Sequence, residues 1–371
     1  MVDYRGALVL APMVRAGELP TRLLALRHGA DLVWGPEIID KKIVTCDRIE
    51  NQKLGTVDYL SHGYTKVPGV TNLVFRTHPK LEAGKLIFQM GTANADVAVQ
   101  AANMIIDDVD GIDINAGCPK HFSIHAGMGA ALLKTPDLLC SILTNLVEKV
   151  GKPKGKPISV KIRLLHKEED TLNLVERLVN TGISNLTLHC RTQEMRNREA
   201  PIRVSVDKVK KICVDHGVNF IINGALTGRK EFEELQEVYG KDMGGMIAEN
   251  AERNPSVFSL TPLDWAPLIK EYIEIAESMC NYIGNSKYML TKMIPGKSIF
   301  YQYIARSKSY DDLREAMKKL NDDGTEKKQE EIEVTKDDEK DAEEETNDKK
   351  RKTDDIQPEE IKRQQTGAIT A

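Results

Sequence analysis

Short apolar runs recur along the first 262 residues of the chain, and polar or amphipathic stretches separate them. Each run is about five residues long and rich in Val, Ile and Leu, which is typical of buried strands. We predict strands at ALVLAP (7–12), DLVWG (31–35), KLIFQM (85–90), GIDIN (111–115), ISVKIR (158–163), NLTLHC (185–190), NFIIN (219–223) and GGMIA (244–248).

Amphipathic segments lie between most of these runs, for example at residues 20–29, 95–108 and 169–180. The period of the pattern therefore alternates between 2 and about 3.6 residues, which indicates parallel strands joined by crossover helices. Eight such units over roughly 250 residues match an α/β fold of the (β/α)8 TIM-barrel type. A doubly wound open sheet is the competing architecture. No Gly-x-Gly-x-x-Gly loop follows the first strand, which argues against a dinucleotide Rossmann site.

Three further segments define the organisation. Residues 41–84 form the longest connection, and we expect its strand-like pieces TVDYL and NLVFR to make an excursion over the barrel mouth. The pattern becomes helical over residues 263–320, so we predict a barrel domain over 1–262 followed by a small α-helical domain. Residues 321–371 hold 18 acidic against 10 basic residues, without apolar periodicity. We predict a disordered acidic low-complexity tail there, because such a segment cannot bury enough apolar surface.

The sequence argues against a secreted, membrane-spanning, disulfide-rich or metal-binding protein. The chain starts without the pattern of a signal peptide, and no apolar run approaches the roughly 20 residues needed to span a membrane. Its six cysteines include no Cys-x-x-Cys pair, so we expect neither a disulfide framework nor a metal site. His121 and His125 are the only histidines at helical spacing, and they lack the Glu of a His-Glu-x-x-His motif. We expect a cytoplasmic protein. A nuclear location rests on the short basic segment KKRK at 349–352.

Cys118 stands out among the cysteines. It follows Asn115 on a loop bounded by Gly117 and Pro119, whereas Cys190 ends the apolar run NLTLHC. Glycine permits close backbone approach and proline fixes φ, so the thiol is presented on a defined turn. A purely structural turn is the alternative explanation.

Polar residues also follow nearly every predicted strand, and strand ends are where barrel enzymes carry their chemistry. Taken singly, Lys161 can be an outward-facing residue and His189 a buried core histidine. Convergence of many such residues on one mouth favours a functional site. The strand-end residues concerned, polar or not, are Pro12, Met13, Gln89, Asn115, Cys118, Lys161, His189, Arg191, Asn223, Gly224 and Ala248.

Several of these residues lie in motifs that resemble the tRNA dihydrouridine synthases. The motifs are LAPM (10–13), Gln89, NAGCP (115–119), VKIR (160–163), LHCRT (188–192), NG (223–224) and GMIA (245–248), and the resemblance covers roughly residues 5–320. The HCR triplet and the segments LVWGPEIID and MIAENAERNPSVF are similar to the eukaryotic branch that acts on the D-loop uridine conventionally numbered 20.

The resemblance implies a TIM barrel that binds FMN and uses NADPH or NADH as reductant. Gln89 would meet the imide edge of the flavin, Pro12 and Met13 would face its ring, and Lys161 would stabilise the reduced form. The phosphate would be held by His189, Asn223, Gly224 and Ala248, near the ends of the last strands. Many family members carry an arginine where this chain has Glu249, so either backbone N–H groups or Arg253 would have to serve the phosphate.

The same resemblance gives Cys118 a role. Reduction of the C5–C6 bond of uracil needs a hydride at C6 and a proton at C5, and a thiol that is mostly protonated at neutral pH can supply the proton. Asn115 and Arg191 would hold the pyrimidine edge.

Residues 285–308 carry basic side chains interleaved with aromatic ones and contain no acid. Cations can track phosphates and aromatic rings can stack on unpaired bases, so we expect tRNA binding through Lys287, Lys292, Lys297 and Arg306. An ordinary helical bundle with amphipathic lysines is the alternative.

The leading functional hypothesis is a tRNA-dihydrouridine(20) synthase, acting on tRNA as a monomer without metal. One alternative is a small-molecule flavin oxidoreductase acting on free pyrimidines. The other is a catalytically inactive tRNA-binding protein.

Overall fold

The computed structural model describes residues 2–62 and 73–327. The chain divides into two compact units, Met1–Leu313 and Arg314–Ala371. The first unit contains a barrel and most of the helices that follow it in sequence. The predicted boundary at residue 262 therefore stays a prediction.

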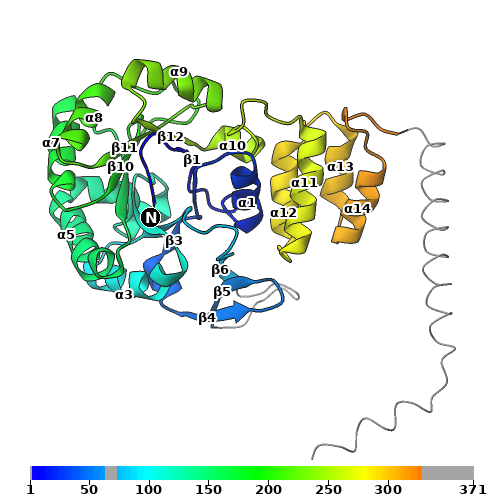
Figure 1. Cartoon of the computed structure of the whole chain (residues 1–371), viewed down its shortest axis with the longest axis horizontal. Helices are drawn as coiled ribbons and strands as arrows, with labels where there is room; N and C mark the ends of the chain where they lie inside the picture. Colours follow the sequence, from blue (N-terminus) through cyan, green and yellow to red (C-terminus); the bar gives the residue numbers. More distant parts are fainter. Residues whose placement is uncertain (1, 63–72, 328–371) are drawn as a thin grey trace, which may run out of the picture. The chain divides into compact units, whose positions relative to one another are not determined.

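The barrel consists of eight parallel strands, which confirms the strands predicted from the apolar runs (Figure 1). The strands pair in the order β2-β1-β12-β11-β10-β9-β8-β7, and β2 also pairs with β7. This last pairing closes the sheet, which rules out the doubly wound alternative. The strands are β1 (Leu8–Leu10), β2 (Leu32–Trp34), β7 (Leu86–Gly91), β8 (Gly111–Ala116), β9 (Ile158–Arg163), β10 (Asn185–His189), β11 (Asn219–Asn223) and β12 (Gly244–Ile247).

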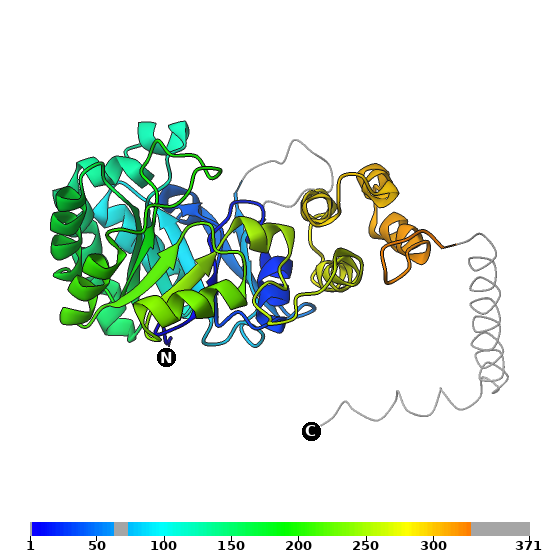
Figure 2. The ribbon, with the colours of Figure 1, turned by 90° about the horizontal axis from the view of Figure 1, so that it is seen from above.

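Helices cover the outside of the strands, as Figures 1 and 2 show. The outer helices are α1 (Leu19–Arg27), α3 (Ala95–Ile105), α5 (Pro136–Leu146), α7 (Glu168–Val179), α8 (Val206–Asp215) and α9 (Arg229–Tyr239). Helix α3 shows how the sequence determines where a helix begins and which of its faces is buried. The Asn94 side chain accepts hydrogen bonds from the N–H groups of Asp96 and Val97, which caps the first turn. Ala98 and Ala102 are fully buried, and their small size lets the helix lie close to its neighbours.

Side chains fill the interior of the barrel. A separate apolar cluster inside the strands includes Val9, Trp34, Ile87, Ile221 and Met246. This packing closes the lower part of the barrel. The carboxyl ends of the strands therefore remain as the place where polar side chains can meet a ligand.

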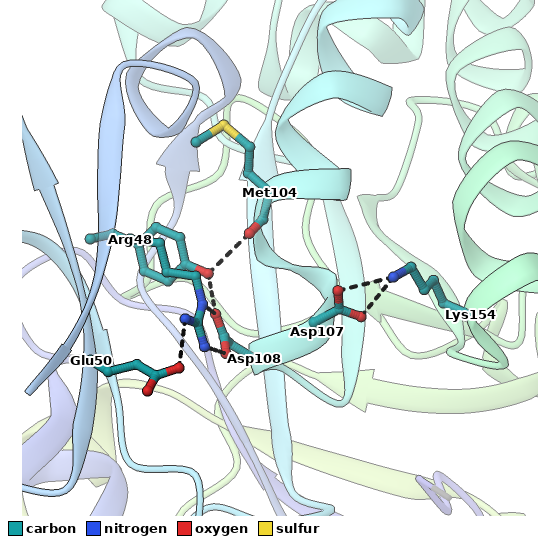
Figure 3. A network of polar contacts seen from close by, with 7 residues as sticks. Arg48, Glu50, Met104, Asp107, Asp108 and Lys154 are labelled. Atoms are coloured by element: carbon teal, nitrogen blue, oxygen red, sulfur yellow. Dashed lines mark hydrogen bonds and ion pairs between the residues drawn. The ribbon is translucent and has the colours of Figure 1, made fainter. Parts of the chain in front are cut away.

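The long second connection forms a three-stranded antiparallel sheet from β4 (Cys46–Asn51), β5 (Thr56–Ser61) and β6 (Leu73–Thr77). Figure 3 shows how it is anchored. Arg48 on β4 donates to both carboxylate oxygens of Asp108 at 2.6 and 2.7 Å, and the Tyr59 hydroxyl on β5 donates to Met104 O at 3.0 Å and also to Asp108. Asp107, beside Asp108, accepts from Lys154.

These contacts show where the described part of the sheet is anchored. Asp108 closes the turn after α3 and precedes the start of β8, so the anchor lies at the opposite end of the strands from the mouth. No described residue between 41 and 84 lines the cavity at the mouth. The loop at 63–72, which joins β5 to β6, lies outside the described residues, so the expected excursion over the mouth stays a prediction.

The helical character predicted for residues 263–320 is confirmed by α11 (Trp265–Ser278), α12 (Ile283–Met293), α13 (Ile299–Arg306) and α14 (Tyr310–Lys318). Helix α11 packs against α1 of the barrel, and α12 packs against both α10 (Glu249–Arg253) and α13. The short elements are β3 (Ile38–Ile39), α2 (Asp40–Ile43), α4 (His121–His125) and α6 (Lys152–Lys154).

The beginning of the predicted tail, residues 321–327, forms a turn closed by a bridge between Leu320 and Glu326. The rest of that tail, with the basic segment at 349–352, lies outside the described residues. Across residues 2–62 and 73–327, no helix is both long and apolar enough to cross a membrane.

Candidate active site at the barrel mouth

A cavity of about 1090 Å³ opens at the carboxyl ends of the strands. Its volume is at the upper end of the range usual for cofactor and substrate sites. The structure brings nine of the predicted residues together in its lining: Pro12, Met13, Gln89, Asn115, Cys118, Lys161, His189, Ala248 and Lys292. The first eight come from the barrel, and Lys292 comes from α12. The mouth is therefore shared by the barrel and the helices that follow it.

A second cavity of about 400 Å³ lies at the ends of β10, β11 and β12. It is lined by Arg191, Asn223 and Gly224, and it shares His189 and Ala248 with the larger cavity. Gly224 has a φ of +130°, which side chains with a Cβ rarely adopt. The four residues predicted to hold the phosphate, His189, Asn223, Gly224 and Ala248, all line this smaller cavity.

Hydrogen bonds from the loop itself fix the turn that carries Cys118. Asn115 Oδ1 accepts from the N–H groups of Gly117 and Cys118, both at 3.0 Å. The Cys118 carbonyl accepts from Ala130 N at 2.9 Å, so the segment at Ala130 lies against the Cys118 turn. A Cβ on Gly129 would lie 2.6 Å from that carbonyl oxygen, so only glycine allows this approach. The half-buried Cys118 thiol is thus held at the cavity wall by backbone geometry.

Cys190, which ends the apolar run NLTLHC, differs from Cys118 in its surroundings. Cys190 is fully buried, and burial raises the pKa of its thiol to about 12. It does not line either cavity. Of these two thiols, only Cys118 can meet a substrate at the mouth.

Lys161 lines the larger cavity from β9. Burial and the charge of Arg163 together lower its pKa to about 8, although the charge of Asp113 opposes the change. The ammonium group therefore keeps its proton at neutral pH but carries it in an unfavourable environment. A negative charge delivered into the cavity would relieve that cost.

His189 is held in its neutral form. Burial and the cations Lys161, Arg163 and Arg191 all hold its pKa well below the ordinary value. Arg191 Nη1 lies 3.1 Å from His189 Nε2, and because an arginine can only donate, Nε2 must be the acceptor. The ring proton is thereby assigned to Nδ1, which can donate to a ligand.

The Arg191 side chain donates hydrogen bonds to backbone carbonyl groups. It donates to the carbonyls of Glu199 and Asn197, at 2.8 and 2.9 Å, and so holds the loop after β10. It lines the smaller cavity but not the one that contains Cys118. Its predicted contact with the pyrimidine remains a prediction.

Glu249 pairs with Arg253 one turn later on α10, at 2.7 Å. Both side chains line both cavities. The acid at this position therefore has a local counter-charge. The pair places Arg253 where a phosphate in the smaller cavity could compete for it.

The four cations predicted to bind tRNA differ in their surroundings. Lys292 lines the larger cavity and lies over the Tyr288 ring, 5.3 Å from its centroid. Lys287 donates to Ser307 O at 2.6 Å, a contact that ties α12 to the end of α13. Lys297 and Arg306 are exposed and line neither cavity. The structure thus brings one of the four to the mouth.

The pair His121 and His125 lies on α4, immediately after the Cys118 turn. Their Nε2 atoms are 2.7 Å apart and both rings are exposed. Within the part of the chain that the structure describes, no group of three or more His, Cys, Asp or Glu side chains could hold a metal ion.

Sequence reasoning gave no role to several lining residues. Arg163 donates to Gly117 O and Thr192 O, both at 2.8 Å, and so links the Cys118 loop to the loop after β10. The loop Arg196–Arg198 reaches the rim of both cavities. Basic lining residues outnumber the acidic ones, Glu37, Glu249 and Glu252. The basic ones are Lys120, Lys161, Arg163, Arg196, Arg198, Arg253 and Lys292.

Comparison with known proteins decides the family. The profile of the dihydrouridine synthase (Dus) family matches residues 9–343. The chain belongs to the dihydrouridine synthase family. The resemblance noted in the sequence motifs is thereby confirmed over most of the chain.

Among its relatives is the tRNA-dihydrouridine(20) synthase [NAD(P)+] of Saccharomyces cerevisiae, 57% identical over 333 residues, or 88% of this chain and 86% of that protein. The Schizosaccharomyces pombe protein of the same name is 44% identical over 322 residues, or 85% of this chain and 66% of that protein. A Homo sapiens tRNA-dihydrouridine(20a/20b) synthase [NAD(P)+]-like protein is 29% identical over 292 residues, or 77% of this chain and 82% of that protein.

Proposed function

We propose that this protein is a tRNA-dihydrouridine(20) synthase, which reduces the C5–C6 double bond of a D-loop uridine in tRNA. The observation that carries the proposal is the placement of Cys118, Lys161 and Gln89 on one cavity with a basic rim, in a chain 57% identical to a protein of that name. A cavity that accepts a base and a rim that accepts phosphates are the two properties the reaction requires.

The residues fit FMN as the cofactor, with NADPH or NADH as the source of electrons. Lys161 supplies a cation, Gln89 an amide, and His189 a ring N–H donor, all facing one cavity. The smaller cavity, with its glycine at positive φ and the nearby Arg253, suits a phosphate. When bound, a reduced flavin supplies the hydride that C6 of the uracil accepts.

Cys118 supplies the proton. Its S–H bond breaks as the C5–H bond forms, so that one hydride and one proton together saturate the C5–C6 bond. The thiolate left on Cys118 is then reprotonated from solvent. Asn115 holds the turn rigidly enough for this transfer, because its side-chain Oδ1 accepts from two successive backbone N–H groups.

Mapping of dihydrouridine in unmodified tRNA after incubation with the protein, FMN and NADPH tests the proposal. We expect reduction at D-loop position 20, none in a tRNA that carries cytidine there, and none of free uridine. Reduction of free uridine at a comparable rate would indicate the small-molecule oxidoreductase. Binding of tRNA without any product, by a protein that holds no flavin, would indicate the binding protein.

A further inference from the structure

The carboxyl group of Asp113 lies inside the barrel, directly behind the cavity wall. Asp113 is fully buried on β8, and Gln89 on β7 is 2% exposed. The two residues are register partners on neighbouring strands, as are Asp113 and Ser159 on β9. Three adjacent strands therefore place these polar side chains at one level of the barrel.

Each oxygen of Asp113 has its own donor. Gln89 Nε2 donates to Oδ2 at 2.8 Å, and the Ser159 hydroxyl donates to Oδ1 at 2.6 Å. Burial raises the pKa of the Asp113 carboxyl group, whereas the hydrogen bonds from Ser159 and Gln89 and the positive charge of Lys161 oppose that shift. Both oxygens of Asp113 accept hydrogen bonds, so Oδ2 selects the amide nitrogen of Gln89 and turns the amide oxygen away.

We propose that Asp113 is a positioning residue that fixes the direction of the Gln89 amide, so that Gln89 Oε1 faces the cavity and accepts from the N3–H group of the flavin. This inference rests on the proposed flavin-dependent function. Gln89 lines the cavity and Asp113 does not, so Asp113 acts through Gln89. A glutamine without this partner can present either its oxygen or its nitrogen.

Binding of FMN and of N3-methyl-FMN to the flavin-free, full-length protein tests the proposal, with quenching of flavin fluorescence as the readout. The methyl group removes the N3–H donor, so we expect the wild type to bind the analogue on the order of tenfold more weakly. In Asp113→Ala the discrimination should fall to about twofold or less, because Gln89 can then turn its amide nitrogen to the cavity.

Three further variants test whether Asp113 acts through Gln89. Gln89→Leu should lose the discrimination as Asp113→Ala does, and the double variant should lose no more than either single one, since both changes remove one interaction. Ser159→Ala is the matched control. It removes the other donor from the same carboxylate and leaves the Gln89 contact, so the tenfold ratio should remain.

Each outcome is decisive. A ratio that stays near tenfold in Asp113→Ala would show that the methyl group is excluded by shape alone, and the proposal would be overturned. Should Asp113→Ala not fold, Asp113→Asn keeps the volume but offers Gln89 an N–H group as readily as an oxygen, so its ratio should fall to about threefold. An undiminished ratio in Asp113→Asn would also overturn it.

Failure of the inference and failure of the proposed function are distinguishable in the same titration. A wild-type protein that binds FMN but does not discriminate against the analogue contradicts the role of Asp113 alone. A wild-type protein that binds neither flavin contradicts the proposed cofactor itself.

Discussion

Replacement of Lys161 by methionine should stabilise the flavin-free protein while removing a functional group. Lys161 is partly buried among apolar strand residues, and its pKa is lowered from 10.5 to about 8. That difference corresponds to about 3 kcal/mol of unfavourable free energy for keeping the charge in the native state. Methionine has a similar length and no charge, so Lys161→Met should raise the free energy of unfolding by up to about 3 kcal/mol at pH 7.

The pH dependence gives this prediction its signature. At pH 7 the lysine is protonated in both the native and the unfolded state, so the full penalty is present. Between pH 8 and pH 10.5 the native protein releases the proton before the unfolded chain does, and the penalty is lost as the pH rises. The advantage of the methionine variant should therefore shrink to below about 1 kcal/mol at pH 10.

Urea unfolding of both flavin-free proteins at pH 7 and pH 10 measures the difference. Lys149→Met, at an exposed position of the outer surface, is the matched control and should change stability by less than about 0.5 kcal/mol. A Lys161→Met protein that is less stable than the wild type at pH 7 would refute the reasoning. An advantage of equal size at both pH values would refute it as well.

Other substitutions test a buried ion pair of the barrel and the predicted phosphate end of the cofactor site. Glu82→Ala should destabilise the protein by about 3–5 kcal/mol in denaturant unfolding, because it leaves the fully buried Arg22 without its partner at 2.6 Å. The same change at exposed Glu50 should cost less than about 1 kcal/mol, and equal losses would contradict the argument. Arg253→Ala should weaken FMN binding about fivefold and Glu249→Gln should strengthen it, as measured by equilibrium titration. Stronger FMN binding by Arg253→Ala together with weaker binding by Glu249→Gln would exclude Arg253 from the phosphate site.

The barrel could be predicted from the sequence because its signal is local. Each strand is a short run such as NFIIN, and every predicted run coincides with an observed strand to within about two residues. The site followed from topology, since parallel strands bring their carboxyl ends to one mouth. Gln89, Cys118 and Lys161 are far apart in sequence and line one cavity for that reason.

Other features depend on packing that the sequence does not display. The position of the three-stranded sheet depends on contacts of Arg48 and Tyr59 with Asp108, which lies 60 and 49 residues further along the chain, and no sequence pattern predicts them. Asp113 had a visible signal, a charged residue in the middle of the apolar run GIDIN. Its meaning required knowledge of which strands flank β8, because its partners Gln89 and Ser159 lie on β7 and β9.

In the proposed reaction, Cys118 delivers the proton to C5 of the uridine. A single-turnover reaction tests it most directly, with the flavin reduced beforehand, unmodified tRNA added, and flavin reoxidation and dihydrouridine followed together. We expect Cys118→Ala to bind flavin as the wild type does but to form dihydrouridine at least about 100-fold more slowly. Equal rates in the two proteins would show that Cys118 is only part of a structural turn, and would contradict the account.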